Sequence, residues 1–400
     1  MDVFFREWDG RAPGETRDIA RARALASALD LLAPDAPVLT VVGSKGKGTA
    51  ATYASAFLAA AGLRVCTVTS PALRSNRERI RVDGRAVSEA ELASLADVLD
   101  EAVAALPPPS GGYLSPSGLF TLAGVLHARR TGADAIVLEA GMGGRSDEAA
   151  LFTPDVAAIT PVLLEHAGVL GRTPAEIAAE KLGVAAPDTL VLSAPQSPEV
   201  AEVLGGVERV EEGGSGIPPE LLPAGLGRVS AELGVAAARR LPGATEPPGG
   251  VLREVLSSVV LPGRLSTHDV PGSATRLLVD AAIDRTGIAA ALAAARRAWG
   301  TIDHVLVCLP DHKDLDGAVT ELGGLPVTFV RLPLPHLRFT RALPPGWDVV
   351  DADAVTPESL AALGCYLVVL GTGYFTGFVL DVVDAATERL FTTSASRRRP

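Results

Sequence analysis

The sequence is poor in aromatic side chains and in cysteine, and it lacks long apolar runs. Aromatic residues make up 4% of the 400 residues, so a core must be built mainly from Ala, Val and Leu. The three cysteines, Cys66, Cys308 and Cys365, lie in apolar strand-like runs without metal-binding spacing, which is typical of free thiols in a reducing compartment. No apolar run approaches the length of a membrane span, and the N-terminus lacks the layout of a signal peptide. We therefore expect a cytoplasmic protein with no membrane partner.

Positive charge is also in short supply. The chain carries 36 Lys and Arg residues against 47 Asp and Glu residues, which gives a formal net charge of −11. That balance favours solubility and argues against a nucleic-acid partner. The composition is otherwise that of an ordinary globular protein, with 48% hydrophobic residues, 41 glycines and 30 prolines. A length of 400 residues predicts two domains, each able to bury its own core.

A glycine-rich stretch lies between an apolar run and a helical pattern. Residues 38–42 predict a buried strand, and apolar residues recur at helical spacing from Ala50 to Ala61. Between them lies Gly43-Ser44-Lys45-Gly46-Lys47-Gly48-Thr49, which differs from the standard Walker A spacing. Backbone N–H groups of such a loop bind phosphates, Lys47 can reach terminal phosphates, and the Thr49 hydroxyl can hold Mg²⁺. We interpret the stretch as a nucleotide site, and the alternative is a glycine-rich turn such as any α/β protein contains.

Predicted strands and helices alternate on both sides of this loop. The expected helices are 17–32, 88–106, 117–130 and 174–184, and the expected strands are 65–69, 135–139, 156–160 and 190–193. This alternation predicts a parallel sheet covered on both faces, with ligands bound beyond the carboxyl ends of its strands. The loop, Ser70, Glu139 and His166 all follow such strand ends, so we expect the fold to bring them to one site.

A second alternating series begins after Pro262-Gly263-Arg264. Before it, residues 205–226 are expected to form a loop, and helices are expected at 230–240 and 252–259. The second series comprises strands at 276–280, 304–308, 327–331 and 366–370 and helices at 287–299, 316–322, 357–363 and after Gly377. We therefore predict two domains, residues 1–260 and residues 261–400.

Several motifs, taken in order, resemble the folylpolyglutamate synthase/dihydrofolate synthase branch of the Mur ligases. The stronger matches are the loop at 43–49, Thr69-Ser70-Pro71 with Glu78-Arg79-Ile80-Arg81, residues 138–145, Glu165-His166 and Glu180-Lys181-Leu182-Gly183. Weaker matches follow residue 260, at Leu261-Pro262-Gly263-Arg264, Asp280, Lys313-Asp314 and residues 371–377. The likeness covers most of residues 17–185 and 228–385.

The resemblance implies an α/β protein: a phosphate-loop-containing, Mur-ligase-like ATPase domain with a parallel sheet, followed by a smaller Rossmann-like α/β domain. It implies an ATP-dependent carbon-nitrogen ligase of the acid–amino acid type, which phosphorylates a carboxylate and lets an amine displace the phosphate. The implied cofactors are ATP and Mg²⁺ at two sites. The implied partners are a small carboxylic acid and an amine or amino acid, and the chain would act as a monomer or small homo-oligomer.

The resemblance also assigns roles to individual residues. The nucleotide would be held by Gly43, Ser44, Lys45, Gly46, Lys47, Gly48, Thr49, Ser230, Arg264 and Asp280. Metal ligation would fall to Thr49, Ser70, Glu139, His166 and Lys181, with Lys181 bridging a second Mg²⁺ as a carbamate. Lys47, Lys181 and His166 are the implied catalytic residues. Because Mg²⁺ prefers oxygen ligands, Glu139 is a better candidate ligand than the His166 nitrogen.

These residues also have structural interpretations. The alternatives are a helix cap or salt bridge for Glu139, an ordinary loop position for His166, a turn before proline for Ser70, a solvated helix charge for Lys181, a solvent-facing side chain for Lys45 and mutual pairing for Arg264 and Asp280.

The substrate side departs from the family pattern. The family's Asp-Gly-Ala-His-Asn-Pro run is residues 280–285 (DAAIDR) here, and the histidine after Ser70-Pro71 is Ala72. The Phe-Glu pair near the start of the third helix is Ser117-Gly118, and the Asp-Ala-Thr-Asn run is residues 147–150 (DEAA). We therefore predict an amide-forming ligase with a diverged, non-folate substrate. The alternatives are a genuine folylpolyglutamate/dihydrofolate synthase, a catalytically inactive ATP-binding relative, and a kinase that stops at the phosphorylated acid.

Overall fold

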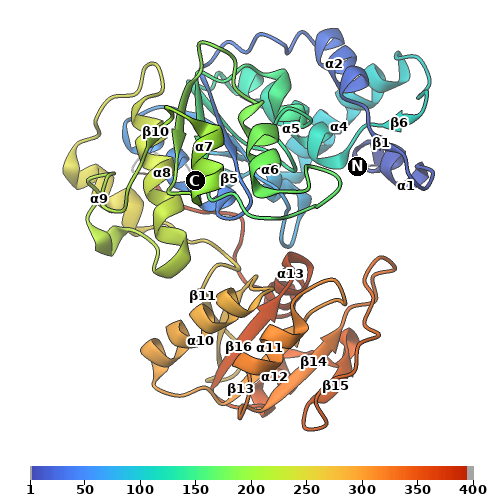
Figure 1. Cartoon of the computed structure of the whole chain (residues 1–400), viewed down its shortest axis with the longest axis vertical. Coiled ribbons are helices and arrows are strands. Elements are labelled where there is room, and N and C mark those ends of the chain that lie inside the picture. Colours follow the sequence, from blue (N-terminus) through green and yellow to red (C-terminus); the bar gives the residue numbers. More distant parts are fainter. Residues whose placement is uncertain (1, 394–400) are drawn as a thin grey trace. The chain divides into compact units, whose positions relative to one another are not determined.

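The computed structural model describes residues 2–393, which form two compact units. The first unit comprises residues 2–71, 77–259 and 388–393, and the second comprises residues 72–76 and 260–387 (Figure 1). The chain thus leaves the first unit for five residues after Pro71 and returns to it near its end. The predicted domain boundary between residues 260 and 261 stays a prediction. The two units also exchange residues 72–76 and 388–393, which the sequence did not predict.

The first unit is built on an eight-stranded sheet in the order β10-β9-β8-β2-β7-β3-β4-β5. Its strands are β2 (Val38–Val42), β3 (Val65–Val68), β4 (Ile80–Val82), β5 (Arg85–Ala86), β7 (Ala135–Glu139), β8 (Val156–Ile159), β9 (Leu190–Ser193) and β10 (Glu208–Arg209). The strands from β10 to β3 run parallel, whereas β4 and β5 add antiparallel at one edge. A separate parallel pair joins β1 (Thr16–Arg17) to β6 (Gly112–Tyr113).

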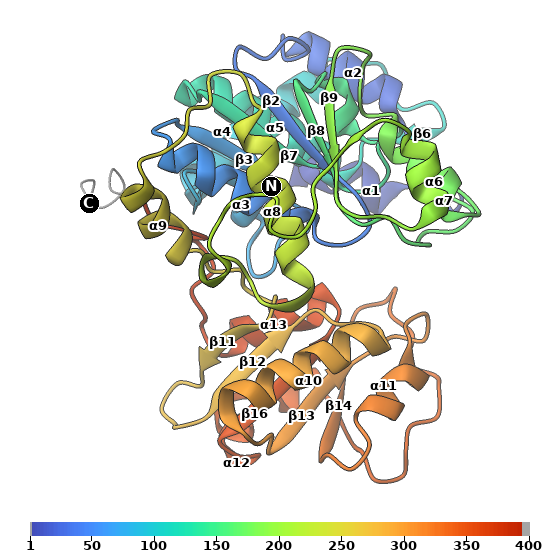
Figure 2. The same cartoon turned by 60° about the vertical axis from the view of Figure 1, so that its left-hand side comes forward.

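Helices cover both faces of this sheet (Figure 2). They are α1 (Arg6–Gly10), α2 (Ile19–Ala28), α3 (Lys47–Ala60), α4 (Glu89–Ala104), α5 (Pro116–Thr131), α6 (Pro174–Leu182), α7 (Pro198–Leu204), α8 (Arg228–Arg239) and α9 (Gly249–Ser257). Short 3-10 turns lie at Asp2–Phe4, Asn76–Arg79, Glu148–Leu151, Pro219–Leu221 and Gly225–Gly227. Every residue of β2 and β7 is buried, as expected for central strands with helices on either side.

The predicted parallel sheet of the first unit is confirmed, and its apolar strands lie where the sequence places them. Strands 38–42, 135–139 and 190–193 match to the residue. The helix predicted at 17–32 is shorter, because the Asp18 side chain accepts the Arg21 N–H and caps α2 at its start. The strands β1, β5, β6 and β10 were not predicted, since elements of two residues carry no periodicity.

The second unit contains a six-stranded sheet in the order β11-β12-β16-β13-β14-β15. Its strands are β11 (Ser266–Asp269), β12 (Arg276–Asp280), β13 (His304–Cys308), β14 (Val327–Arg331), β15 (Asp348–Asp351) and β16 (Tyr366–Gly371). Only β11 is antiparallel to its neighbour within this described sheet. The helices are α10 (Arg285–Trp299), α11 (Leu315–Glu321), α12 (Pro357–Ala362) and α13 (Gly373–Val382), with a 3-10 turn at Ala352–Ala354.

The start of α13 differs from the prediction of a helix after Gly377. Thr372 caps the helix by accepting the Phe375 N–H, so the first turn falls within the glycine-rich run. Gly377 lies inside the helix, where a side chain would overlap the backbone carbonyl of Leu73. Across residues 2–393, none of the helices combines the length and the apolar character that a bilayer crossing requires.

Candidate functional site

The glycine-rich loop makes a tight turn between β2 and α3. Gly43 and Gly46 have φ angles of 138° and 87°, in the region that favours glycine. A side chain on Gly43 would overlap the Thr160 hydroxyl, and one on Gly46 would overlap the Ser230 hydroxyl. The two glycines therefore let the loop lie directly on β8 and α8, and Ser230, predicted to contact the nucleotide, lies against the loop.

The rest of the loop is tied to the segment that follows β8. The Ser44 N–H donates to the Pro161 carbonyl at 2.9 Å, and the Leu163 N–H donates to the Ser44 hydroxyl at 3.0 Å. Gly46 is the N-cap of α3, so the loop sits at the positive end of a 14-residue helix. The side chain of Lys45 is exposed. This arrangement is the one that binds phosphate groups in strand–loop–helix proteins.

Two lysine ammonium groups converge on one carbonyl oxygen of the loop. Lys47 Nζ donates to the Gly43 carbonyl at 3.0 Å, and Lys181 Nζ, from α6, donates to the same oxygen at 2.9 Å. Lys181 is 1% exposed and also pairs with Glu165 Oε1 at 2.8 Å. It is thus a buried charge beside the loop and not a solvated helix charge.

The pKa values of both partners in this ion pair are lowered. Burial lowers the pKa of Lys181, and the nearby charge of Lys47 lowers it further, while the Glu165 carboxylate opposes the shift. Burial would raise the pKa of Glu165, but the hydrogen bond and charge of Lys181 outweigh it, so the pKa of Glu165 is lowered. The lysine is therefore closer to its neutral form than a solvated lysine, and the glutamate is held as a carboxylate.

Oxygen-bearing side chains lie near Gly48 of the loop. Glu139, the last residue of β7, is 7% exposed, and its Oε2 accepts the Ser70 N–H at 3.0 Å. A Cβ atom on Gly48 would lie 3.3 Å from the same Oε2, so the carboxylate lies against the loop next to Thr49. The Ser70 hydroxyl accepts from Arg79 Nη1 at 3.0 Å. A carboxylate with neighbouring hydroxyls fits the oxygen preference of Mg²⁺.

His166 follows Glu165 directly but is not buried. Its side chain is exposed, its φ is 45°, and its carbonyl accepts the N–H groups of Val169 and Leu170. Within residues 2–393, no three His, Cys, Asp or Glu side chains form a group that could hold a metal ion. A metal at the loop would therefore depend on Glu139, the hydroxyls and water, and ligation by His166 stays a prediction.

Arg264 and Asp280 belong to the second unit. Asp280 ends β12, and its Oδ2 accepts the Leu265 N–H at 2.8 Å. Arg264 Nη1 donates to the Gly263 carbonyl at 3.0 Å. These contacts fix the turn that precedes β11, and the contact of either residue with a nucleotide stays a prediction.

One departure from the family pattern is compensated within the fold. A side chain on Gly118 would overlap the carboxyl group of Glu148, which is 1% exposed and accepts from the Ser115 hydroxyl at 2.6 Å. Thus Glu148 fills the space beside Gly118, where the family pattern has a glutamate. Burial and the adjacent Asp147 raise the pKa of Glu148, while Arg17 opposes that shift.

Two further residues of the site were not assigned a role from the sequence. Arg17 donates to the Met142 carbonyl at 2.7 Å and to Asp147 at 3.1 Å, and so it ties β1 to the glycine turn that follows Glu139. Glu165 is the partner of Lys181. The acidic residue beside His166 was a usable signal for Glu165, whereas nothing near Arg17 in the sequence points to residues 142–148.

No family model matches the chain. Among curated proteins it is 32% identical over 212 residues to the dihydrofolate synthase/folylpolyglutamate synthase of Mycobacterium tuberculosis, covering 49% of this chain and 43% of that protein. It is 34% identical over 168 residues to the protein of the same name from Escherichia coli, covering 42% and 38%. A probable bifunctional folylpolyglutamate synthase/dihydropteroate synthase of Halobacterium salinarum is 37% identical over 164 residues, covering 41% and 20%. The matched region therefore spans less than half of each of these relatives.

Solved structures share the fold over nearly the whole chain. The folylpolyglutamate synthase of Mycobacterium tuberculosis complexed with ADP superposes with a TM-score of 0.79 at 22% identity, covering 96% of this chain and 99% of that one. The bifunctional folylpolyglutamate synthase/dihydrofolate synthase of Yersinia pestis, complexed with AMPPNP and Mn, gives a TM-score of 0.74 at 24% identity, covering 94% and 95%. At 22% and 24% sequence identity, these superpositions show a shared fold and nothing about activity.

The chain has an α/β fold that it shares with solved folylpolyglutamate synthases, and the predicted fold class is confirmed. Within that class the chain is similar to folylpolyglutamate synthase/dihydrofolate synthase, so the resemblance of its motifs to that branch is confirmed as well.

Proposed function

We propose that the chain is an ATP-dependent carbon-nitrogen ligase whose nucleotide is held at the glycine-rich loop. The observation that carries the proposal is the convergence of Lys47 and Lys181 on the Gly43 carbonyl, with the Glu139 carboxylate beside Gly48 of the same loop. Phosphoryl transfer to a carboxylate requires positioning and charge neutralisation more than a protein nucleophile. The loop amides and the Lys47 ammonium would supply both.

Mg²⁺ would be held by Glu139 with the hydroxyls of Ser70 and Thr49, and it would neutralise charge on the phosphates. The carboxylate is preorganised for this role, since the Ser70 N–H fixes one of its oxygens. The relative from Yersinia pestis was solved with Mn and AMPPNP, which supports a nucleotide and a divalent ion in this fold.

A carbamate on Lys181 is part of the proposal. The lowered pKa of Lys181 increases its neutral form, and the neutral amine is the form that adds CO₂. Glu165 holds the ammonium in this structure, so carbamylation would break that ion pair and leave two carboxylates near each other. A second metal ion between them would offset that repulsion. Mass spectrometry of the intact protein under ¹³CO₂, with Lys181→Met as the control, tests the modification.

The preferred substrates are a folate-type acid and glutamate. The expectation of a diverged, non-folate substrate finds no support in the comparisons, because the similar curated proteins carry the names of folylpolyglutamate or dihydrofolate synthases. The Glu148 carboxyl group in the space beside Gly118 supports this proposal, because one sequence departure is matched by a carboxyl group from another part of the chain. A small acid and an amino acid as partners, and a cytoplasmic location, follow from the same proposal.

The test is incubation of the full chain with ATP, Mg²⁺, glutamate and either dihydropteroate or tetrahydrofolate, followed by mass analysis of the products. We expect a product that has gained one or more glutamyl groups, together with ADP and phosphate. Lys47→Ala should lower turnover by about a hundredfold or more, because it removes a charge that neutralises the transferred phosphate. Arg23→Ala, an exposed substitution on α2, is the matched control.

Other products would identify the alternatives. ADP with an acyl phosphate and no amide would indicate a kinase. Nucleotide binding without any turnover that depends on Lys47 would indicate an inactive relative. Amide formation with a different acid, and none with either folate, would restore the diverged substrate and overturn the preferred one.

A further inference from the structure

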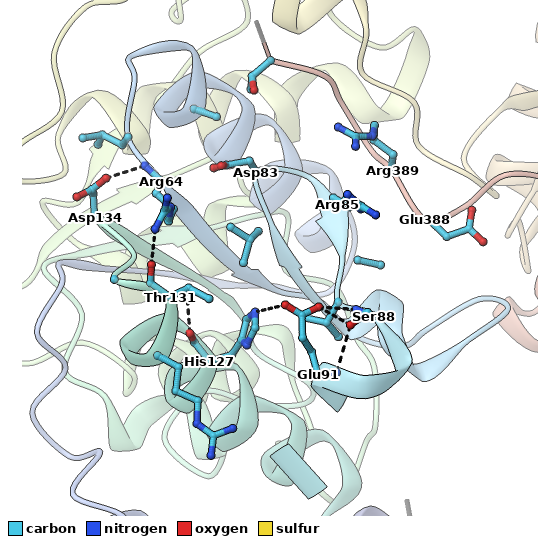
Figure 3. A pocket seen from close by; sticks show the side chains of 18 of the residues that line it. Arg64, Asp83, Arg85, Ser88, Glu91, His127, Thr131, Asp134, Glu388 and Arg389 are labelled. Carbon is cyan, nitrogen blue, oxygen red and sulfur yellow. Dashed lines mark hydrogen bonds and ion pairs between the residues drawn. The ribbon is translucent and has the colours of Figure 1, made fainter. Parts of the chain in front are cut away.

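A large cavity lies in the first unit, away from the glycine-rich loop. It has a volume of about 1360 Å³ and is lined by the C-terminal ends of α3 and α5, the start of α4 and the chain at 388–393 (Figure 3). Arg64 and Asp134, which line it, directly precede the parallel strands β3 and β7, whereas Glu139 ends β7. The cavity therefore lies at the N-terminal ends of the parallel strands, whereas the loop lies at their C-terminal ends.

The wall of this cavity is rich in guanidinium groups. The arginines that line it are Arg64, Arg77, Arg85, Arg130 and Arg389. The carboxylates that line it are Asp83, Glu91, Asp134 and Glu388.

These carboxylates already serve local structure. Asp83 accepts the Val65 N–H at 2.9 Å, and Asp134 accepts the Arg64 N–H at 2.8 Å. Glu91 accepts the Ser88 N–H in a capping box, and its Oε1 lies 4.0 Å from His127 Nε2. Figure 3 shows Glu91 between Ser88 and His127. Burial lowers the pKa of His127, so this histidine adds little positive charge at neutral pH. Asp83, Glu91 and Asp134 are thus engaged, and the charge of Glu388 acts on the buried Arg81 guanidinium, whose pKa it raises against the effect of burial. The arginines that line the cavity therefore define the charge offered to a ligand.

Two of these arginines face each other without a counter-ion of their own. Arg85 and Arg389 are partners in an isolated antiparallel bridge, so their side chains lie on the same face of the sheet. Among the residues that the structure describes, neither guanidinium has a hydrogen bond or ion pair, although Arg85 is near enough to Glu91 to contribute to the lowered pKa of that carboxyl. Like charges placed directly opposite are destabilising. An anion between them would remove that repulsion.

We propose that this cavity binds a small organic polyanion, whose phosphate or carboxylate groups lie between Arg85 and Arg389. A guanidinium presents paired N–H donors that match both kinds of anion, and two of them provide a site for at least two negative charges. Arg64 and Arg130 are engaged elsewhere, since Arg64 donates to the Thr131 carbonyl at 2.5 Å and Arg130 to the Ser94 hydroxyl at 3.3 Å. The proposal does not depend on the proposed ligase activity.

The test is isothermal titration of the full chain with pyrophosphate and with citrate. We expect saturable binding of at least one probe, and the tighter one identifies phosphate or carboxylate as the preferred group. The double variant Arg85→Ala/Arg389→Ala should weaken that binding by about tenfold or more, because it removes both guanidinium groups that donate charge-assisted hydrogen bonds to the anion. Arg23→Ala, exposed and outside the cavity, should not change it.

Pyrophosphate can also bind at the glycine-rich loop, so Lys47→Ala locates the binding. Binding that Lys47→Ala keeps and the double arginine variant loses supports the cavity. Absence of saturable binding in the wild-type chain, or binding that Lys47→Ala removes and the double variant keeps, overturns the proposal. The melting temperature of the double variant without ligand should be unchanged or higher, since a like-charge contact is removed. A large decrease would overturn the proposal, because it would mean that the two arginines stabilise the fold without a ligand.

Discussion

At the scale of single residues, the ion pair of Lys181 with Glu165 shows what a helical pattern leaves open. Glu180-Lys181 on an amphipathic helix is compatible with a solvated charge, and only the fold places Lys181 at 1% exposure beside the Gly43 carbonyl. Removing one partner of a buried pair costs more than the pair contributes, because the other charge stays behind. The Glu165 side chain is 25% exposed, so water compensates part of that loss.

We predict that Lys181→Met lowers the free energy of unfolding by about 1–3 kcal/mol at neutral pH, measured by urea denaturation. The matched control is Arg240→Ala, which removes a half-exposed pair with Glu208 and should cost less than about 1 kcal/mol. Equal losses in the two variants would contradict the burial argument.

The same pair predicts a dependence on pH. The pKa of Glu165 is lowered in the folded chain, so its contribution to stability is present above its ordinary value of 4.5 and is lost as the pH falls through the folded pKa. Wild-type stability should therefore fall in this acidic range, and Lys181→Met should flatten that part of the profile because it removes the group that lowers the pKa. Parallel profiles for the two proteins, measured by urea denaturation at several pH values, would rule out this pair as a source of the dependence.

At the scale of elements, the start of α5 contacts the start of the Glu148–Leu151 turn. This contact explains why a glycine occupies position 118. Gly118 and Glu148 are far apart along the chain, and neither residue alone predicts that one occupies the space beside the other. We predict that Gly118→Ala lowers the free energy of unfolding by about 1–3 kcal/mol through overpacking. Glu148→Ala should also destabilise, because it removes one acceptor of the Arg17 guanidinium and the acceptor of the Ser115 hydroxyl. The double variant should be more stable than the sum of the two changes, whereas simple additivity in urea denaturation would count against direct contact.

The contact between α8 and α3 also depends on a glycine. A side chain on Gly234 would overlap the Ala50 carbonyl, which is backbone and cannot rotate away. We expect Gly234→Ala to lower the free energy of unfolding of the first unit by several kcal/mol. The same overlap should displace Ser230 from the loop. Gly250→Ala, in α9 with no atom near the added methyl, is the control and should be neutral or stabilising. Calorimetry of the two variants gives their melting temperatures. A decrease in Gly234→Ala alone would be due to steric overlap, because both substitutions raise helix propensity.

The sequence predicts central strands far better than edges. The strands β2, β7 and β13 are predicted from their mostly apolar sequences, because every one of their residues is buried. The short strands β4, β5 and β11 depend on pairing with a partner that the local sequence does not name. The site divides in the same way: loop residues 43–49 follow from local chemistry, whereas Glu165 and Arg17 gain their roles from contacts over long distances in the chain.

At the scale of the whole molecule, the first unit is completed by residues from near the end of the chain. The Ala86 N–H donates to the Glu388 carbonyl, and the buried Arg81 guanidinium donates to the same oxygen at 2.8 Å. Phe391 is 1% exposed and lies over Gly84. This short stretch therefore closes one edge of the eight-stranded sheet.

We predict that Phe391→Ala destabilises the first unit by about 3–5 kcal/mol, since it removes a buried aromatic ring. Hydrogen exchange at the Ala86 amide should report the loss locally, because that amide bonds the returning chain. Val349→Ala, at a residue that is 42% exposed, should have little effect. Unchanged exchange at Ala86 in the Phe391 variant would mean that the ring does not anchor the edge.

The return of the chain at residue 388 has a consequence for folding during synthesis. Domains commonly fold in order as they leave the ribosome, the N-terminal one first. In this protein the edge formed by β4 and β5 must wait for Glu388 and Phe391, which are translated after the entire second unit. The nascent first unit therefore remains unfinished at that edge, without the Glu388 carbonyl that accepts from Ala86 and Arg81, until residues 388–391 have been translated.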